Sequence, residues 1–177
     1  MNDVGDNPEL RRRIENNDPS LDKLAIWDLK TSEYEQQTYV PSSVDAWKAD
    51  GISLGRNTHI KKIKIEVPED VEKDTFRIFC EGLANNSSIE YMYIAYSKFG
   101  ADVFYLLKPF FLKNKNLREM RLDGNFGSSN DAVEKLCEAL QSFCALRKFR
   151  FHFGTKLNET GTELLFELSL VIPIWQA

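Results

Sequence analysis

Cysteine and histidine are scarce in this chain, and their scarcity excludes several kinds of site. The 177 residues include three cysteines and two histidines. The cysteines (Cys80, Cys137 and Cys144) are odd in number and lack CxxC spacing, so neither a disulfide framework nor a zinc site is expected. Cys80 and Cys137 are at equivalent positions of two predicted helices, where they should fill the core as small apolar groups.

Long apolar runs are also absent. No segment approaches the roughly 18 apolar residues that a membrane-spanning helix needs. The N-terminal sequence MNDVGDNPELRRRIENNDPS has no apolar stretch behind its basic cluster, so it does not resemble a secretory signal. We therefore expect a reducing intracellular location, the cytoplasm first and the nucleus as the alternative. The glycosylation sequons at Asn85, Asn86 and Asn158 are then expected to be ordinary turn residues.

What the chain does contain is a recurring apolar motif. It reads Ile60-x-x-Ile63-x-Ile65 and returns at Ile89, Leu117 and Leu146, so the starts differ by 29, 28 and 29 residues. A variant begins at Leu21. A fixed period in this range is typical of a stacked array, in which each unit buries its apolar edge against its neighbours.

Each unit has an alternating segment followed by a segment with helical periodicity. IKKIKIEV, IEYMYIAY, LREMRLDG and LRKFRFHF alternate as strands with one buried face do, and FRIFCEGL, VFYLLKPFFL, AVEKLCEAL and TELLFEL place apolar residues at helical spacing. Tandem strand–helix units predict an α/β fold with a parallel sheet. A doubly wound or barrel fold would normally have strands that are apolar on both faces, whereas these are charged on one, so one face of the sheet should be open.

The pattern resembles the ribonuclease-inhibitor-like class of leucine-rich repeats, whose units have 28 to 29 residues. LREMRLDGN fits that consensus best, with Asn125 at the asparagine position, while the other units have Pro68, Ser97 and Gly154 there. The resemblance implies a curved solenoid of about five repeats, with the sheet on the concave side and helices on the convex side. It also implies protein binding through side chains unrelated to the consensus.

Three segments are expected to depart from this repeat. Residues 1–20 are polar and should form an N-terminal arm or cap to a solenoid spanning 21–177. The polar stretch 31–43 reads as a loop insertion, after which Ser42 or Ser43 can cap a helix. The end of the chain runs into VIPIW, an apolar flank. Either the array continues in a longer chain, or this tail folds back, or it docks to a partner.

The side chains between the apolar positions should point to the open face. At the third, fifth and seventh motif positions these include six cations, Lys23, Lys62, Lys64, Arg121, Lys148 and Arg150, and three acids, Glu66, Glu119 and Asp123. Tyr and Arg are enriched at interface anchors. The candidate binding residues are therefore Trp27, Lys62, Lys64, Tyr91, Tyr93, Arg121, Asp123, Lys148, Arg150 and His152.

No catalytic set accompanies these residues. His152 should lie beside Asp123, but no serine or cysteine is expected on this face, so a nucleophile is missing and a pH-dependent ion pair is the better interpretation. No cofactor or metal is implied. We expect a non-enzymatic module that binds another protein, with an acidic surface as one kind of partner, on its concave face. The alternative is an RNA- or other polyanion-binding module that uses the same cations with stacking tyrosines.

Overall fold

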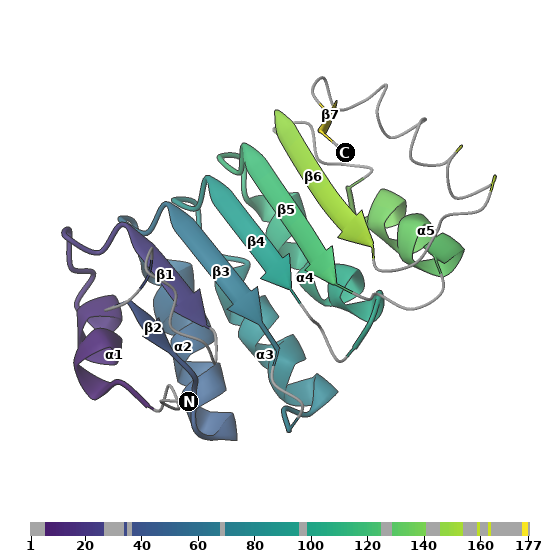
Figure 1. Cartoon of the computed structure of the whole chain (residues 1–177). Coiled ribbons are helices and arrows are strands. Elements are labelled where there is room, and N and C mark those ends of the chain that lie inside the picture. Colours follow the sequence, from purple (N-terminus) through teal and green to yellow (C-terminus); the bar gives the residue numbers. More distant parts are fainter. Residues whose placement is uncertain are drawn as a thin grey trace.

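We analysed a computed structural model of the chain (Figure 1). The structure describes residues 6–26, 34, 37–67, 70–95, 99–124, 129–140, 146–153, 159, 163 and 175–176. The helices are α1 (Pro8–Glu15), α2 (Val44–Arg56), α3 (Lys73–Leu83), α4 (Asp102–Lys113) and α5 (Ser129–Leu140). The strands are β1 (Lys23–Ile26), β2 (Thr38–Tyr39), β3 (Lys62–Glu66), β4 (Tyr91–Ala95), β5 (Glu119–Gly124), β6 (Lys148–Phe153) and β7 (Trp175–Gln176).

The described strands form one parallel seven-stranded sheet in the order β2-β1-β3-β4-β5-β6-β7. The units pair in the register that the motif predicts, because Lys23, Lys62, Tyr91, Glu119 and Lys148 are consecutive partners across five strands. Helices α2 to α5 cover one face of this sheet and leave the other face without helices (Figure 1). The prediction of an α/β fold with a parallel sheet and one open face is therefore confirmed.

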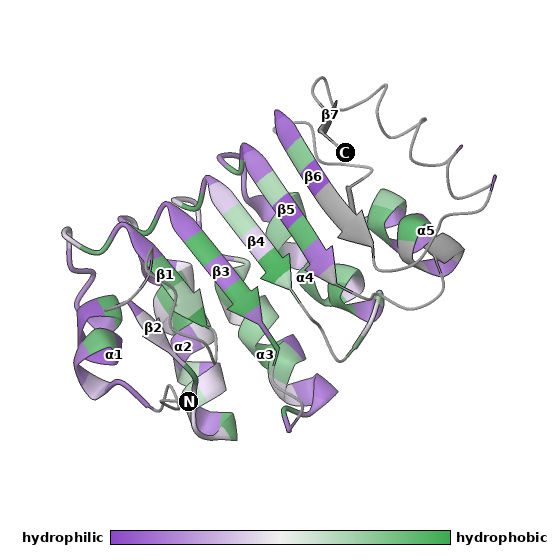
Figure 2. Ribbon diagram, in the orientation of Figure 1, coloured by the Kyte–Doolittle hydropathy of each residue, from purple (hydrophilic) through white to green (hydrophobic). Residues whose placement is uncertain are grey.

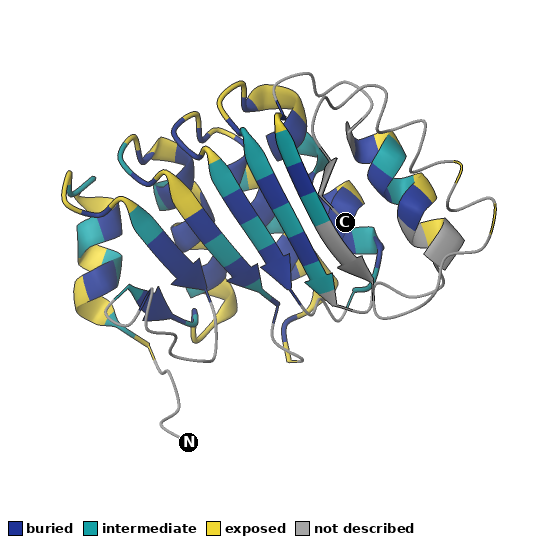
Figure 3. Cartoon of the chain, turned by 45° about the horizontal axis from the view of Figure 1, so that its top comes forward, coloured by how far each residue is buried: buried dark blue, intermediate teal, exposed yellow. Residues whose placement is uncertain are grey.

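The alternation along each strand determines which side chains enter the core. In β3 the side chains of Ile63 and Ile65 are fully buried, whereas Lys62 is exposed and Lys64 is half-buried. The neighbouring strands repeat this alternation. Hydrophilic and hydrophobic residues alternate along them in Figure 2, and buried residues alternate with less buried ones in Figure 3. The core therefore lies between the sheet and the helices, as period-two strands require.

Aromatic side chains fill the helix side of this core. Trp47 of α2 packs edge-on against Phe79 of α3, with ring centroids 5.2 Å apart, and Phe76 stacks on Phe79 at 5.6 Å. Offset and edge-on arrangements are those that aromatic pairs prefer. Helix α2 begins where the sequence predicts, because the Ser43 hydroxyl accepts a hydrogen bond from the Ala46 amide at 3.1 Å.

Glycines allow α2 and α3 to approach closely. A Cβ atom added to Gly55 would lie 2.1 Å from the carbonyl oxygen of Gly82, and one added to Gly51 would lie 2.5 Å from that of Phe79. No side chain fits at these distances, so the backbones of the two helices are in direct contact. Spacing of glycines by four residues places both on the same face of α2.

Three buried asparagines fix the turns that enter the strands. Asn57, Asn86 and Asn114 lie three residues before the first apolar residue of three successive motifs. The Asn86 carboxamide accepts hydrogen bonds from the amides of Ser88 and Ile89 at 2.9 Å and donates to the carbonyls of Leu54 and Asn57. Asn114 repeats this arrangement one unit later, donating to the carbonyls of Asn86 and Ile89. These bonds satisfy buried backbone groups both within a turn and between units.

The segments expected to be irregular contain further structure. Helix α1 lies within residues 1–20 and contributes Leu10 and Ile14 to the common core. Strand β2 lies within the expected insertion 31–43 and pairs with β1. Strand β7 pairs in parallel with β6 and so extends the sheet. The three alternatives for the end of the chain stay predictions. The division of the chain at residue 20 stays a prediction. Within the described ranges, no helix is both long and apolar enough to cross a membrane.

Candidate functional site

A row of cations and one aromatic ring crosses the open face of the sheet. Lys64, Tyr93, Arg121 and Arg150 are successive register partners on β3, β4, β5 and β6. We call these four residues the cation–aromatic row. Because they share one pleat position, all four project from the face opposite the helices.

Tyr93 is the centre of this row. The Lys64 Nζ and the Arg121 guanidinium carbon each lie 5.0 Å from the centroid of its ring. These distances are within the range of cation–π attraction. The Tyr93 hydroxyl donates a hydrogen bond to the Asp123 carboxylate at 2.7 Å, so the ring is held at its edge as well as over its face.

Asp123 links the aromatic ring to the neighbouring strand. Its carboxylate accepts hydrogen bonds from the Arg121 guanidinium, Nε at 2.9 Å and Nη2 at 2.5 Å. Burial, and then the hydrogen bond to Asp123, raise the pKa of Tyr93 above its usual value. The hydrogen bond to Asp123 also raises the pKa of Arg121. The three side chains therefore form one ordered polar cluster, with Tyr93 protonated and Arg121 charged at neutral pH.

Acidic side chains separate the arginines that the register brings together. Arg121 and Arg150 are direct neighbours on β5 and β6, where like charges would repel. Arg121 bonds to Asp123, while Arg150 lies 3.5 Å from Glu119, which also contacts Lys148 at 3.3 Å. The repulsion expected from the sequence is thus reduced by carboxylates of the same face.

An apolar cluster adjoins the row and was not predicted from the sequence. Ala25, Tyr34 and Ala95 are buried together, and Tyr93 packs against them. The Lys23 Nζ lies 5.8 Å from the centroid of the Tyr34 ring. Part of the insertion therefore folds onto the sheet face and supports Tyr93. The signal for this contact in the sequence is Tyr34, one of two tyrosines in the largely polar stretch 31–43.

The remaining predicted binding residues are distributed around the row. Lys62 is exposed, and Tyr91 is half-buried on the next strand in register with it. The backbone of His152 pairs with that of Asp123, but the His152 side chain lies outside the described part of the chain, so the proposed ion pair stays a prediction. Trp27 is also outside the described residues. The structure thus brings together eight of the ten on this face: Lys62, Lys64, Tyr91, Tyr93, Arg121, Asp123, Lys148 and Arg150.

Metal-binding and nucleophilic chemistry have little basis in the described residues. Among them, no three His, Cys, Asp or Glu side chains come close enough to hold a metal ion. Cys80 is buried, and burial raises the pKa of its thiol well above the usual value, which suits a core residue rather than a nucleophile. The arrangement on the open face is suited to binding through cations, an aromatic ring and hydrogen bonds.

Comparison with known proteins finds the fold but no sequence family. No protein-family model and no curated protein sequence matches the chain. Among solved structures, it is similar to actin-binding site 2 of leiomodin-1, with a TM-score of 0.65 and 16% identity over 90% of this chain and 85% of that one. It is also similar to the tropomodulin C-terminal domain of Caenorhabditis elegans, with a TM-score of 0.60 and 14% identity over 90% and 89% of the two chains.

These matches correct the resemblance given by the sequence. The assignment to the ribonuclease-inhibitor-like class of leucine-rich repeats is wrong, because the structures matched are the leiomodin and tropomodulin domains. The physical reason is that any stack of parallel strand–helix units imposes a similar period and the same alternation. The one feature specific to that class, an asparagine after the strand, is present in one unit of four, and all four positions lie outside the described residues. The leiomodin-1 structure is named as an actin-binding site, and at 16% identity the match shows a shared fold.

Proposed function

We propose that this chain is a non-enzymatic protein-binding module, that it acts inside the cell, and that actin is the first partner to test. The observation that carries the proposal is the cation–aromatic row, whose central ring is already fixed by two cations and a carboxylate. A fixed ring loses little conformational freedom on binding. The similar leiomodin-1 structure, which is named as an actin-binding site, supports a protein partner and the choice of actin.

The row also indicates the surface that would bind. Central Tyr and Arg side chains that are partly shielded from solvent are the residue types most often found at interface anchors. Tyr93 and Arg121 are both half-buried and lie near the middle of the sheet. The cations exceed the acids on this face, which favours a partner surface that is acidic.

The polyanion alternative is weaker in the light of these contacts. Glu119 lies at ion-pair distance from Lys148 and Arg150, and Asp123 accepts a hydrogen bond from Arg121. Carboxylates at these positions would repel a phosphate backbone that followed the row. A protein surface, which can present donors and acceptors in alternation, fits the interleaved charges better.

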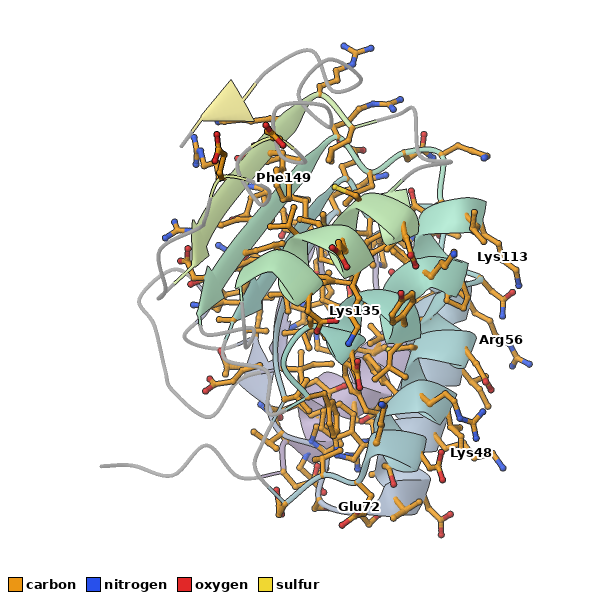
Figure 4. All side chains as sticks on the ribbon, turned by 90° about the vertical axis from the view of Figure 1, so that its right-hand side faces the viewer. Lys48, Arg56, Glu72, Lys113, Lys135 and Phe149 are labelled. Carbon is orange, nitrogen blue, oxygen red and sulfur yellow. The ribbon has the colours of Figure 1, made fainter. Side chains whose placement is uncertain are left out.

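The experiment is an affinity series with actin on matched charge reversals. Lys64→Glu with Arg150→Glu reverses two cations of the open face, and Lys48→Glu with Arg56→Glu reverses two exposed cations of α2. Lys48 and Arg56 project from the helix side in Figure 4. We expect the open-face pair to weaken binding by about tenfold or more and the α2 pair to change it little. Melting temperatures of both variants check that each is folded.

Four results would contradict the proposal. Equal affinity of the two double variants would remove the open face from the interaction, and loss of affinity only in the α2 variant would move the binding surface to the helices. Absence of any binding to actin would reject that partner. If the chain instead bound single-stranded RNA with a steep dependence on salt concentration, the polyanion function would replace the one proposed.

A further inference from the structure

A pocket lies where strands of the sheet end and helices begin. It is a pocket of about 380 Å³ between the start of α2 and the start of α3. We call it the strand-end pocket. Its volume is within the range of ligand-binding pockets. In parallel α/β sheets, the crevice outside the carboxyl ends of the strands is the usual position for a ligand.

The inner surface of the strand-end pocket is apolar. Val40 and Pro41 line it from the β2–α2 connection, Val71 from the β3–α3 connection and Trp47 from α2. Val44, also in the lining, is 58% exposed although it is a large apolar residue. An exposed aliphatic side chain beside a partly enclosed apolar surface is suited to contact another apolar group.

The rim of the pocket is acidic. Asp6, Asp70 and Glu72 line it, and no lysine or arginine does among the described residues. Arg11, which lies 3.0 Å from Asp6, is also bound to the buried carboxylate of Asp50 at 3.1 Å, so its charge is shared between two acids. The Glu72 side chain makes no capping hydrogen bond to α3 and lies at the lower edge of the helix layer in Figure 4. The rim therefore retains an excess of negative charge.

This charge pattern decides between kinds of ligand. Helix N-termini by themselves favour anions, but carboxylates on the rim of this pocket oppose an anion. A metal ion needs converging ligands, and no metal-binding group of three such side chains exists in the described part of the chain. Separated carboxylates around an apolar surface instead complement a peptide that alternates apolar and basic side chains.

We propose that the strand-end pocket binds an extended segment of a protein partner in which aliphatic side chains alternate with lysine or arginine. The aliphatic side chains contact Val44 and Val71, and the basic side chains pair with Asp70 and Glu72. This site is separate from the cation–aromatic row, because it lies at one edge of the sheet and its rim has the opposite charge. The chain would then contact partners through two surfaces of opposite sign.

The test is a titration of the 15N-labelled chain with a blocked tetrapeptide, Arg-Leu-Lys-Leu. We expect amide shifts at Val40, Val44, Val71 and Thr75. Two matched peptides separate the contributions: Glu-Leu-Glu-Leu reverses the charge and Arg-Ser-Lys-Ser removes the apolar groups. Both should bind at least about fivefold more weakly, because each loses one of the two complementary features.

Two variants and a control test the same residues from the protein side. Asp70→Asn with Glu72→Gln should weaken the Arg-Leu-Lys-Leu peptide by about fivefold, a modest effect expected of exposed charges. Val44→Ser should weaken it similarly without unfolding the protein, since Val44 is largely exposed. Glu134→Gln, an exposed acid of α5, should have no effect. Shifts confined to the open face, equal binding of Arg-Ser-Lys-Ser, or unchanged affinity in both pocket variants would each overturn the proposal.

Discussion

Single buried side chains hold successive units of this protein together. Asn86 illustrates this, because its carboxamide contacts the turn of its own unit and carbonyls of the preceding one. Asn57, at the start of the series, has no partner for its buried amide nitrogen among the described residues. The buried asparagines therefore stabilise the stack by joining each unit to the preceding one. Asn86 and Asn114 donate hydrogen bonds to the preceding unit, and within the described part of the chain Asn57 does not.

Asn86→Ala should lower the free energy of unfolding by about 3 kcal/mol, because buried backbone amides and carbonyls lose their partners. Urea denaturation at neutral pH measures this loss. Asn85→Ala is the matched control, since the neighbouring side chain is exposed, and it should change stability by less than about 0.5 kcal/mol. Similar losses of stability in the two variants would show that the buried asparagines do not stabilise the fold.

Tyr93→Phe should change how the stability of the protein depends on alkaline pH. The pKa of Tyr93 is raised by burial and by its bond to Asp123, so between the ordinary value of 10.0 and the raised one the folded state holds a proton that the unfolded state has lost. Stability contributed by the Tyr93 hydroxyl is thus present below about pH 10 and is lost as pH rises above it. The stability difference between the two proteins should shrink from about pH 9 to about pH 11. A constant difference would mean that the hydroxyl is not buried against Asp123.

At the scale of elements, helix α2 and helix α3 form the closest contact of the helix layer. Gly51, Gly55 and Gly82 permit it, since an added Cβ atom at any of them would overlap backbone of the facing helix. The repeat motif does not predict this contact, because apolar periodicity identifies the buried stripe of a helix but not how near its neighbour approaches. The spacing of Gly51 and Gly55 by four residues was the available signal.

Gly55→Ala should destabilise the protein by about 2 kcal/mol, although alanine is the better helix former by about 1 kcal/mol. The added methyl group would meet the Gly82 carbonyl oxygen and force α2 and α3 apart. The measurement is thermal unfolding of this variant and of Lys48→Ala, a substitution at an exposed position of the same helix. The comparison separates the steric effect of the added methyl group from the effect of helix propensity. A gain in stability for Gly55→Ala would mean that the two backbones are not in contact.

Ion pairs join the first residues of α3 and α4 to the middle of α5. Asp102 bonds to Lys135 at 2.7 Å and to Lys73 at 2.5 Å, and these bonds lower the pKa of Asp102 below its usual 3.8. Its stabilising effect should thus be present above about pH 4 and be lost as pH falls through the lowered value.

Asp102→Asn should lower stability at pH 7 by a few tenths of a kcal/mol, because the pairs are partly exposed to solvent. The difference from the unmodified protein should shrink as pH falls below about 4 and should decrease in high salt. Urea midpoints at three pH values provide the measurement. A difference that persists unchanged at low pH would contradict an electrostatic origin.

For the whole molecule, the sequence predicts the parallel sheet, its register and the exposed face, since alternation and period follow directly from strand and helix geometry. Ile63 and Lys62 fall on the faces that the motif assigns to them. It does not predict the position of Tyr34, because contacts of an insertion depend on the three-dimensional path of the chain. Nor does the period distinguish one class of strand–helix stack from another, because many such stacks share it.

The strand-end pocket also depends on the three-dimensional path of the chain and could not be predicted from the sequence. Its residues come from the N-terminal segment and from two strand–helix connections that are distant in sequence. No repeat position marks them, and only the stacking of the units brings them to one edge. Binding on this edge and on the open face would give one small domain two contact surfaces.

The most direct test of the central claim, that the open face of the sheet binds the protein partner, is lysine acetylation of the unmodified chain with and without saturating actin, read by mass spectrometry. Lys62 and Lys64 lie on the open face, whereas Lys48 and Lys113 lie on the helices, as Figure 4 shows for the latter two. The account predicts that actin protects Lys62 and Lys64 and leaves Lys48 and Lys113 as reactive as before. Protection of Lys48 and Lys113 with Lys62 and Lys64 unchanged would contradict it.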